Sequence, residues 1–77
     1  MKFAIDTRNQ EEYNAVKEFA SAYDVLWTCG GYVEGKVIYA IDTITKTLQV
    51  DFVYNMKALA AKGYVYVRAW YVGSIIL

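Results

Sequence analysis

The chain contains no histidine and only one cysteine, Cys29, among its 77 residues. A single thiol cannot complete a tetrahedral metal site, and it cannot form a disulfide within the chain. A catalytic cysteine also needs a base that generates the thiolate, and histidine is the usual one. We therefore interpret Cys29 as a small apolar side chain, and we expect a protein that is not an enzyme and holds no metal or cofactor.

Neither the carboxylates nor the glycines form a catalytic pattern. Asp6, Asp42 and Asp51 are far apart in the sequence, and strand ends or turns account for the first two without any chemistry. A phosphate-binding loop leads into a helix, whereas Gly30-Gly31 and Gly35 lead into a predicted strand. These residues do not change the prediction of a non-enzymatic protein.

Proline is also absent, and we find no repeats, no low-complexity linker and no long apolar run. Residues 1–77 are therefore expected to form one domain. The segment 1–6 reaches an acidic residue too early for a signal peptide, and every apolar run is shorter than the ~18 residues of a membrane span. With one free thiol, we expect a cytoplasmic protein with no membrane partner, located in the host cytoplasm if it is viral.

Neither sign of charge predominates, because eight Lys and Arg balance eight Asp and Glu. A protein that binds duplex DNA carries a basic excess, so this balance argues against such a role. A net charge near zero favours association. A chain of this length buries only roughly 60% of its unfolded surface, and such chains gain stability from a disulfide, a metal or a partner. With the first two excluded, we expect a homodimer or another protein partner.

The N-terminal part predicts a strand followed by a helix. Residues 2–6 place apolar side chains on one side, as expected for a half-buried strand. Asn9 and Glu12 fit a capping box, and the residues that follow repeat at helical spacing. The predicted helix covers residues 10–23, and its apolar stripe consists of Tyr13, Val16, Phe19, Ala20 and Tyr23.

Two further strands are predicted after this helix. Residues 25–29 form the first, and Gly30-Gly31 is typical of a hairpin turn. The run that starts at Tyr32 is interrupted by Gly35, which indicates a bulge or bend, and continues over 36–42. Both faces of 36–42 are apolar, so we expect this strand to be central in the sheet.

The segment 47–54 fits either a strand or a helix. Its apolar residues alternate strictly with polar ones, which favours a strand that pairs with 36–42 through a turn at 43–46. Asn55 would then cap a short helix over 56–62, and Gly63 would end it.

The clearest strand in the sequence is 64–72, which is bounded by glycines and rich in aromatic and β-branched residues. Alternation predicts that Val65, Val67, Ala69 and Tyr71 face the core. The opposite face carries three aromatic residues and one cation. Because Tyr, Trp and Arg are enriched in protein interfaces, we predict a binding surface there, with Trp27 and Tyr32 at its rim. Its members are Tyr64, Tyr66, Arg68 and Trp70.

These elements predict a two-layer α+β domain, in which one long and one short helix pack on a mostly antiparallel sheet of about five strands. The order along the chain is βαβββαβ. The alternative is a long helix over 46–62, which gives the ferredoxin-like order βαββαβ. The apolar tail 73–77 is expected to add a strand or to pack against a neighbour.

For function, we expect a small protein-binding module that acts by occupying a surface of another protein. Small, cysteine-poor chains without motifs are typical of viral accessory proteins, such as those of phages, and of mobile-element proteins, including inhibitors of host or defence proteins. The alternative is a dimeric binder of a small ligand, a nucleotide or single-stranded nucleic acid, which would use the aromatic sheet face to stack bases.

Overall fold

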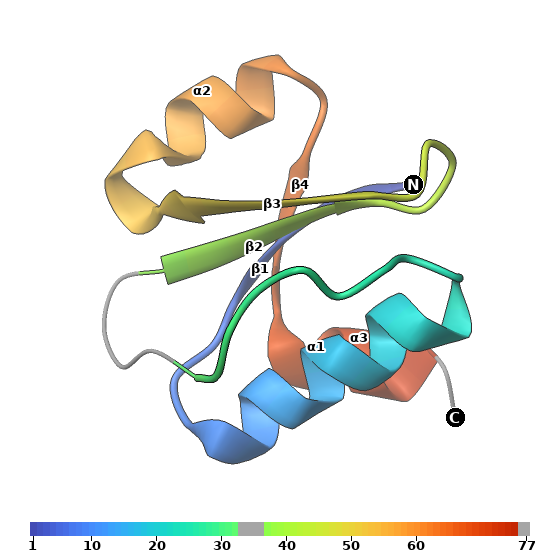
Figure 1. Cartoon of the computed structure of the whole chain (residues 1–77). Coiled ribbons are helices and arrows are strands. Elements are labelled where there is room, and N and C mark those ends of the chain that lie inside the picture. Colours follow the sequence, from blue (N-terminus) through green and yellow to red (C-terminus); the bar gives the residue numbers. More distant parts are fainter. Residues whose placement is uncertain (33–36, 76–77) are drawn as a thin grey trace.

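The computed structural model describes residues 1–32 and 37–75 and shows a small α+β domain with a four-stranded mixed sheet (Figure 1). The strands are β1 (Lys2–Asp6), β2 (Val37–Asp42), β3 (Thr47–Phe52) and β4 (Val65–Arg68). The helices are α1 (Gln10–Ala22), α2 (Met56–Ala61) and α3 (Ala69–Ile75), and a 3-10 turn (Val53–Asn55) precedes α2.

The strand order in the sheet is β3-β2-β1-β4. β1 is antiparallel to β2, where Phe3 lies opposite Ile41, and parallel to β4, where Phe3 lies opposite Val65. β2 continues the antiparallel pairing to β3. The first and second strands are therefore interior, whereas β3 and β4 form the two edges of the sheet.

Helices cover both faces of the sheet, which corrects the predicted two-layer arrangement. Figure 1 shows α2 on one side of the strands and both α1 and α3 on the other. The physical reason is that the interior strands are apolar on both faces, so each face requires a cover. The smaller cluster under α2 consists of Ala4, Ile38, Ala40 and Leu59. The larger cluster, under α1 and α3, includes Phe3, Ile5, Val16, Phe19, Tyr39, Ile41, Ala69 and Val72.

The structure confirms the long helix and the cap predicted for it. The Asn9 side chain accepts a hydrogen bond from the Glu12 backbone N–H at 2.9 Å. The Glu12 carboxylate accepts in turn from the backbone N–H of Arg8 at 3.3 Å. Asp24 follows the helix with a φ of 59°, a left-handed conformation that stops helical continuation.

The strand β3 and the short helix α2 are also confirmed, although β3 ends at Phe52, two residues before the predicted end. Gly63 has a φ of 92°, as expected for the residue that ends a helix. Asn55 precedes α2 but makes no side-chain cap. Its amide donates instead to Asp51 at 2.7 Å, and this bond, followed by the Phe52 N–H, lowers the pKa of the Asp51 carboxyl.

The predicted strand over 25–29 is wrong, because this segment forms no ladder in the sheet. β1 lies on one side of β2 and β3 lies on the other, so β2 has no free edge with which residues 25–29 could pair. The segment instead lies across the face of the sheet, in the layer of α1 (Figure 1). Its alternation buries Val25 and partly buries Trp27 and Cys29, while Leu26 is exposed. The turn residues Gly30-Gly31 therefore do not join two paired strands, and Gly35 lies outside the described residues.

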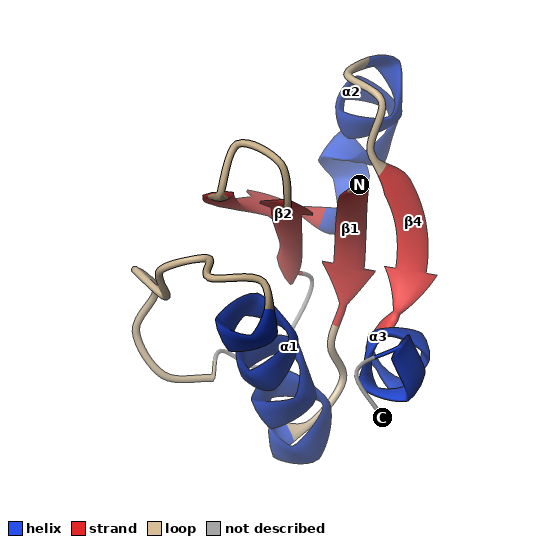
Figure 2. Cartoon of the chain, turned by 90° about the vertical axis from the view of Figure 1, so that its right-hand side faces the viewer, coloured by secondary structure: helices blue, strands red, loops and turns tan. Residues whose placement is uncertain are grey.

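The predicted strand 64–72 is only half a strand. β4 ends at Arg68 because its partner β1 ends at Asp6, and the chain then turns directly into α3 (Figure 2). In the helix, the i and i+3 positions Ala69 and Val72 enter the core. The sheet consequently has four strands, not five. The ferredoxin-like alternative is also wrong, because it required a helix over 46–62 and places its helices in one layer.

The turn between β2 and β3 supplies a pH-dependent test of the fold. The Asp42 carboxylate accepts hydrogen bonds from the backbone N–H of Ile44 at 2.9 Å and of Thr45 at 3.3 Å, which lowers the pKa of this carboxyl. A lowered pKa means that the ionised group stabilises the folded state above the ordinary value of 3.8 and loses this effect as the pH falls below it. We expect Asp42→Ala to lower Tm at neutral pH, with the difference from wild type narrowing toward about pH 3. Thermal melts followed by circular dichroism measure Tm for both proteins across this pH range. A difference in Tm that stays constant with pH would contradict the stabilising role of the ionised Asp42 carboxylate.

Candidate binding surface and cavity

The structure separates the four residues that were predicted to share one face. Tyr64 is partly buried and packs against the cluster under α2. Tyr66 lies on β4 and is exposed, and Arg68 is the last residue of that strand. Trp70 lies on α3 and is 66% exposed. The predicted residues therefore lie along the edge of the sheet and the start of a helix, not on one sheet face.

Two of these side chains are fixed by neighbours on β1. The Tyr66 hydroxyl donates to the Asp6 carboxylate at 2.9 Å, and burial followed by this bond raises the pKa of the phenol. The Lys2 amine lies 5.4 Å from the centre of the Tyr64 ring, within the range of a cation–π contact. Both rings are thus held by the strand that pairs with β4.

Arg68 is engaged inside the protein. Its Nη2 lies 3.2 Å from both carboxylate oxygens of Glu12 on α1. The two side chains retain only 28% and 19% of their accessible surface, and Nε of Arg68 is buried without a hydrogen-bond partner. Arg68 therefore ties the end of β4 to the start of α1.

Four large apolar side chains are exposed along the β4 edge and the first turn of α3. Phe3 connects two of them, because it lies opposite Val65 and its ring centre is 6.3 Å from that of Tyr71. Tyr71 in turn lies 6.3 Å from Trp70, measured between ring centres. Tyr66 follows Val65 on β4 and therefore points to the other face of the strand, where its hydroxyl donates to Asp6. We name this group the β4–α3 surface: Val65, Tyr66, Trp70 and Tyr71. Tyr71 was predicted to face the core, since a strand was assumed where the helix lies.

A second exposed apolar group lies on and after β3. The rings of Phe52 and Tyr54 stack with centres 5.3 Å apart and planes within 4°. Both are exposed, as is Val50 on the same face of β3 as Phe52. The alternation over 47–54 already placed these side chains together, but no prediction of a site followed from it.

Trp27 and Tyr32, predicted at the rim of the binding surface, belong to an aromatic cluster on the α1 side of the sheet. Tyr13 is its centre, with ring centres 5.5 Å from Trp27, 5.9 Å from Tyr32 and 5.8 Å from Tyr39. The Tyr13 hydroxyl donates to the Gly30 carbonyl and accepts from the Trp27 indole N–H at 3.0 Å. The cluster therefore holds the segment after α1 against the sheet.

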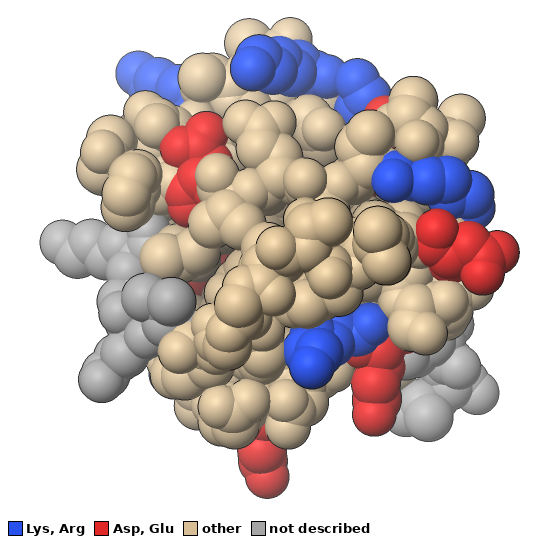
Figure 3. Space-filling model, in the orientation of Figure 1, with Lys and Arg blue, Asp and Glu red and all other residues tan. Residues whose placement is uncertain are grey.

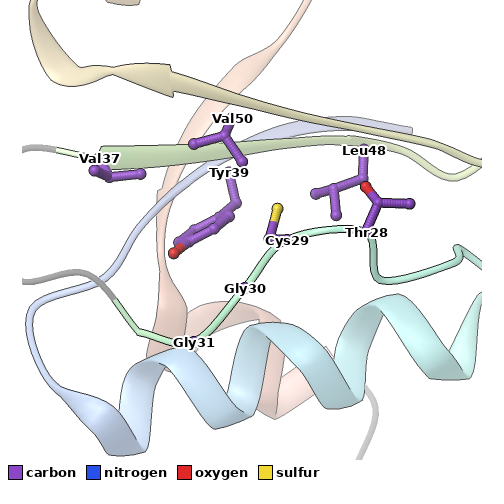
Figure 4. Close-up of a pocket in the computed structure, with 8 residues that line it drawn as sticks. All are labelled: Thr28, Cys29, Gly30, Gly31, Val37, Tyr39, Leu48 and Val50. Carbon is purple, nitrogen blue, oxygen red and sulfur yellow. The ribbon is translucent and has the colours of Figure 1, made fainter.

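A cavity of about 400 Å³ lies between this segment and the strands β2 and β3 (Figure 4). Cys29 and Tyr39 are at its centre, and burial raises the pKa of the Cys29 thiol, which disfavours the reactive thiolate. The remaining lining residues are Thr28, Gly30, Gly31, Val37, Leu48 and Val50.

The three aspartates considered for catalysis do not meet. Asp6 and Asp51 both lie across from Ile38, on either side of β2, whereas Asp42 is at the opposite end of that strand. Within the ranges 1–32 and 37–75, no three acidic, cysteine or histidine side chains are grouped to hold a metal ion.

Charged side chains are dispersed over the side of the molecule on which β3 lies. Figure 3 shows both signs scattered over this side, with an uncharged area across its middle. No helix in the described part of the chain is both long and apolar enough to cross a membrane.

Comparison of the chain with protein-family models, with curated proteins and with solved structures finds no match. The function is therefore argued from the geometry alone.

Proposed function

We propose that the protein is a small non-enzymatic protein-binding module that uses the β4–α3 surface. The observation that supports this is the exposure of Val65, Trp70 and Tyr71, which are linked through Phe3, and of Tyr66 on the other face of the same edge strand. Soluble proteins rarely expose large apolar groups side by side unless a partner covers them. Tyr and Trp are also the residues that contribute most often to binding hot spots.

The position of this surface at the edge of the sheet suggests how it binds. β4 pairs with β1 on one side only, so the backbone groups on its other side can accept a strand from a partner. The aromatic side chains flank this edge and supply contact area beyond the backbone. Binding would block whatever the partner does with the covered surface, as expected for an accessory protein that inhibits a host protein.

A nucleic-acid role receives less support from the same geometry. Stacking platforms place several aromatic rings on one open sheet face next to basic side chains. Here Tyr64 packs against the cluster under α2, Trp70 is on a helix, and Arg68 is paired with Glu12. We therefore retain the protein-binding function as the proposal.

Trp70→Ala tests the proposal, because the side chain is largely exposed and its loss should leave the fold intact. We expect at least tenfold weaker binding to the partner, the effect of removing a hot-spot residue. The tagged wild-type chain, the variant and a control are compared by quantitative capture from the cell that encodes the protein. The control is Ile44→Ala, which removes a side chain that is 79% exposed in the turn 43–46.

Light scattering on a size-exclusion column is run first, against the 8.8 kDa of one chain. A dimer that Trp70→Ala dissociates and Ile44→Ala does not would identify a second copy as the partner. If all three chains are monomeric and capture the same proteins in the same amounts, the proposed function is wrong.

A further inference from the structure

We propose that the cavity between residues 28–31 and strands β2 and β3 binds a small, uncharged and largely apolar molecule that carries a hydrogen-bond acceptor, such as an aryl ketone. This site is separate from the β4–α3 surface, and the proposal does not depend on the protein-binding function. It rests on the dimensions of the cavity, on the accessible Tyr39 hydroxyl and on the uncharged character of the lining residues that the structure describes.

The cavity has the dimensions and composition of a ligand site. Its volume of about 400 Å³ lies within the range of roughly 300–1,000 Å³ that is common for small-molecule pockets. Val37, Leu48 and Val50 supply apolar walls from β2 and β3, while the segment of Cys29 closes the opposite side (Figure 4). Such pockets combine apolar walls with a few polar groups that fix the orientation of the ligand.

Tyr39 supplies the polar group. The residue is only 2% exposed, and its ring is held by contacts with Tyr13 and Trp27. Within the described ranges, its hydroxyl makes none of the hydrogen bonds found in the structure, whereas the Tyr13 hydroxyl beside it makes two. Figure 4 shows the Tyr39 ring extending from β2 toward Gly31, with the oxygen at its far end. In the described part of the chain, the side-chain polar atoms that are buried without a partner are Thr7 Oγ1 and Arg68 Nε, so the Tyr39 oxygen is still accessible and can donate to an acceptor on a ligand in the cavity.

The protonation state of this hydroxyl determines what it can bind. Burial, reinforced by the nearby Tyr13, Cys29 and Tyr32, raises the pKa of Tyr39 to about 12. The phenol therefore keeps its proton at neutral pH and can donate it. A carbonyl oxygen on the ligand is the matching acceptor.

The lining also selects against charged molecules. None of the eight described lining residues is acidic or basic. A carboxylate or ammonium group placed against these eight residues would lose hydration without gaining an opposite charge from them, which costs more than the entry of a neutral group. A neutral ketone has an acceptor for the phenol and carries no charge. Its oxygen can pair with the Tyr39 hydroxyl while its apolar part lies against the walls.

Three naphthalene probes of the same shape test this: 2-acetylnaphthalene, 2-ethylnaphthalene and 2-naphthoate. Titrations of the full chain are followed by the amide NMR signals of Gly30 and Gly31, together with amides distributed over the rest of the chain. We expect the ketone to shift the glycine signals and to bind about tenfold more tightly than the ethyl compound, which is the effect of one hydrogen bond. The carboxylate is expected to bind more weakly than both.

Two variants locate the site. Tyr39→Phe removes only the unpaired hydroxyl, so it should fold normally and should bind the ketone and the ethyl compound equally. Val50→Trp fills the cavity from a half-exposed strand position and should abolish binding, while Ile44→Trp adds the same ring in the turn 43–46 and should not. The proposal is overturned if no probe shifts the glycine signals, if Tyr39→Phe leaves the preference for the ketone unchanged, or if the carboxylate binds as tightly as the ketone.

Discussion

Phe19→Ala is expected to destabilise the protein by about 3–5 kcal/mol, the cost of removing a fully buried aromatic ring. Phe19 has no exposed surface and lies in the middle of the apolar stripe of α1. Its ring centre is 5.7 Å from that of Phe3 on β1 and 4.9 Å from that of Tyr23. The alanine would therefore leave a void between α1 and the centre of the sheet.

This loss is large relative to the whole stability of so short a chain. The free energy of unfolding is roughly 0.05–0.15 kcal/mol per residue in native proteins, which gives about 4–12 kcal/mol for a domain of this length. Urea unfolding monitored by circular dichroism should show the midpoint falling by about 2 M or more, or a chain already unfolded without denaturant. Lys17→Ala on the exposed side of the same helix serves as the control. A midpoint for Phe19→Ala that matches this control would refute the packing described for α1.

Glu12→Ala is expected to cost about 2–3 kcal/mol, because this carboxylate serves two structures at once. It accepts from the Arg8 backbone at the start of α1, and it pairs with Arg68 at the end of β4. Its removal leaves a largely buried guanidinium without a counter-charge, and Nε of that group already lacks a partner. Partial exposure of both side chains keeps the cost below that of a fully buried pair.

Arg68→Met separates the two roles of Glu12. Replacement of the cation with an apolar side chain of similar length leaves no buried charge on β4, so we expect a smaller loss than for Glu12→Ala. The double variant should be no less stable than Glu12→Ala alone, since the second change removes the unpaired guanidinium. Denaturant unfolding of the four proteins completes the double-mutant cycle. Strictly additive losses would show that the ion pair makes no contribution.

The elements that were predicted correctly from the sequence are those whose periodicity reflects their own burial. The stripe of α1 belongs to a helix that packs on one side, so the pattern alone is sufficient. The alternation of β3 also predicted a strand, although its apolar residues Val50 and Phe52 are exposed. β2 was predicted as a central strand from its two apolar faces, and β1 and β3 do flank it.

The errors arise where a neighbour decides the structure. Residues 25–29 alternate as a strand does, but β2, the strand they were expected to pair with, already has β1 on one side and β3 on the other. Residues 64–72 also alternate, yet the ladder could extend only as far as Asp6 on β1. Neither the number of free edges nor the length of a partner strand can be read from the segment itself.

The candidate sites also divide into features that a local pattern predicts and features that depend on neighbouring elements. Exposed Tyr66 and Trp70 were predicted as binding residues, although a strand was assumed for both and Trp70 is on α3. Tyr71 was not predicted as a binding residue, because alternation in the assumed strand placed it on the core face. The cavity at Tyr39 combines residues from β2, β3 and the segment 28–31, and its existence depends on how that segment crosses the sheet. No local sequence pattern specifies such a crossing.

The interior position of β1 has a consequence for how the protein is made. Among the four strands, β1 is synthesised before the others and needs a partner on each side, and the second of these partners, β4, is synthesised after β2, β3 and α2. Until β4 emerges, a nascent chain holds β1 with one side of its backbone unpaired, which is the exposed edge that invites wrong pairing. Completion of the sheet therefore waits until β4 has been synthesised. Chains that terminate after α2 are expected to be substrates for chaperones and proteases, not smaller folded units.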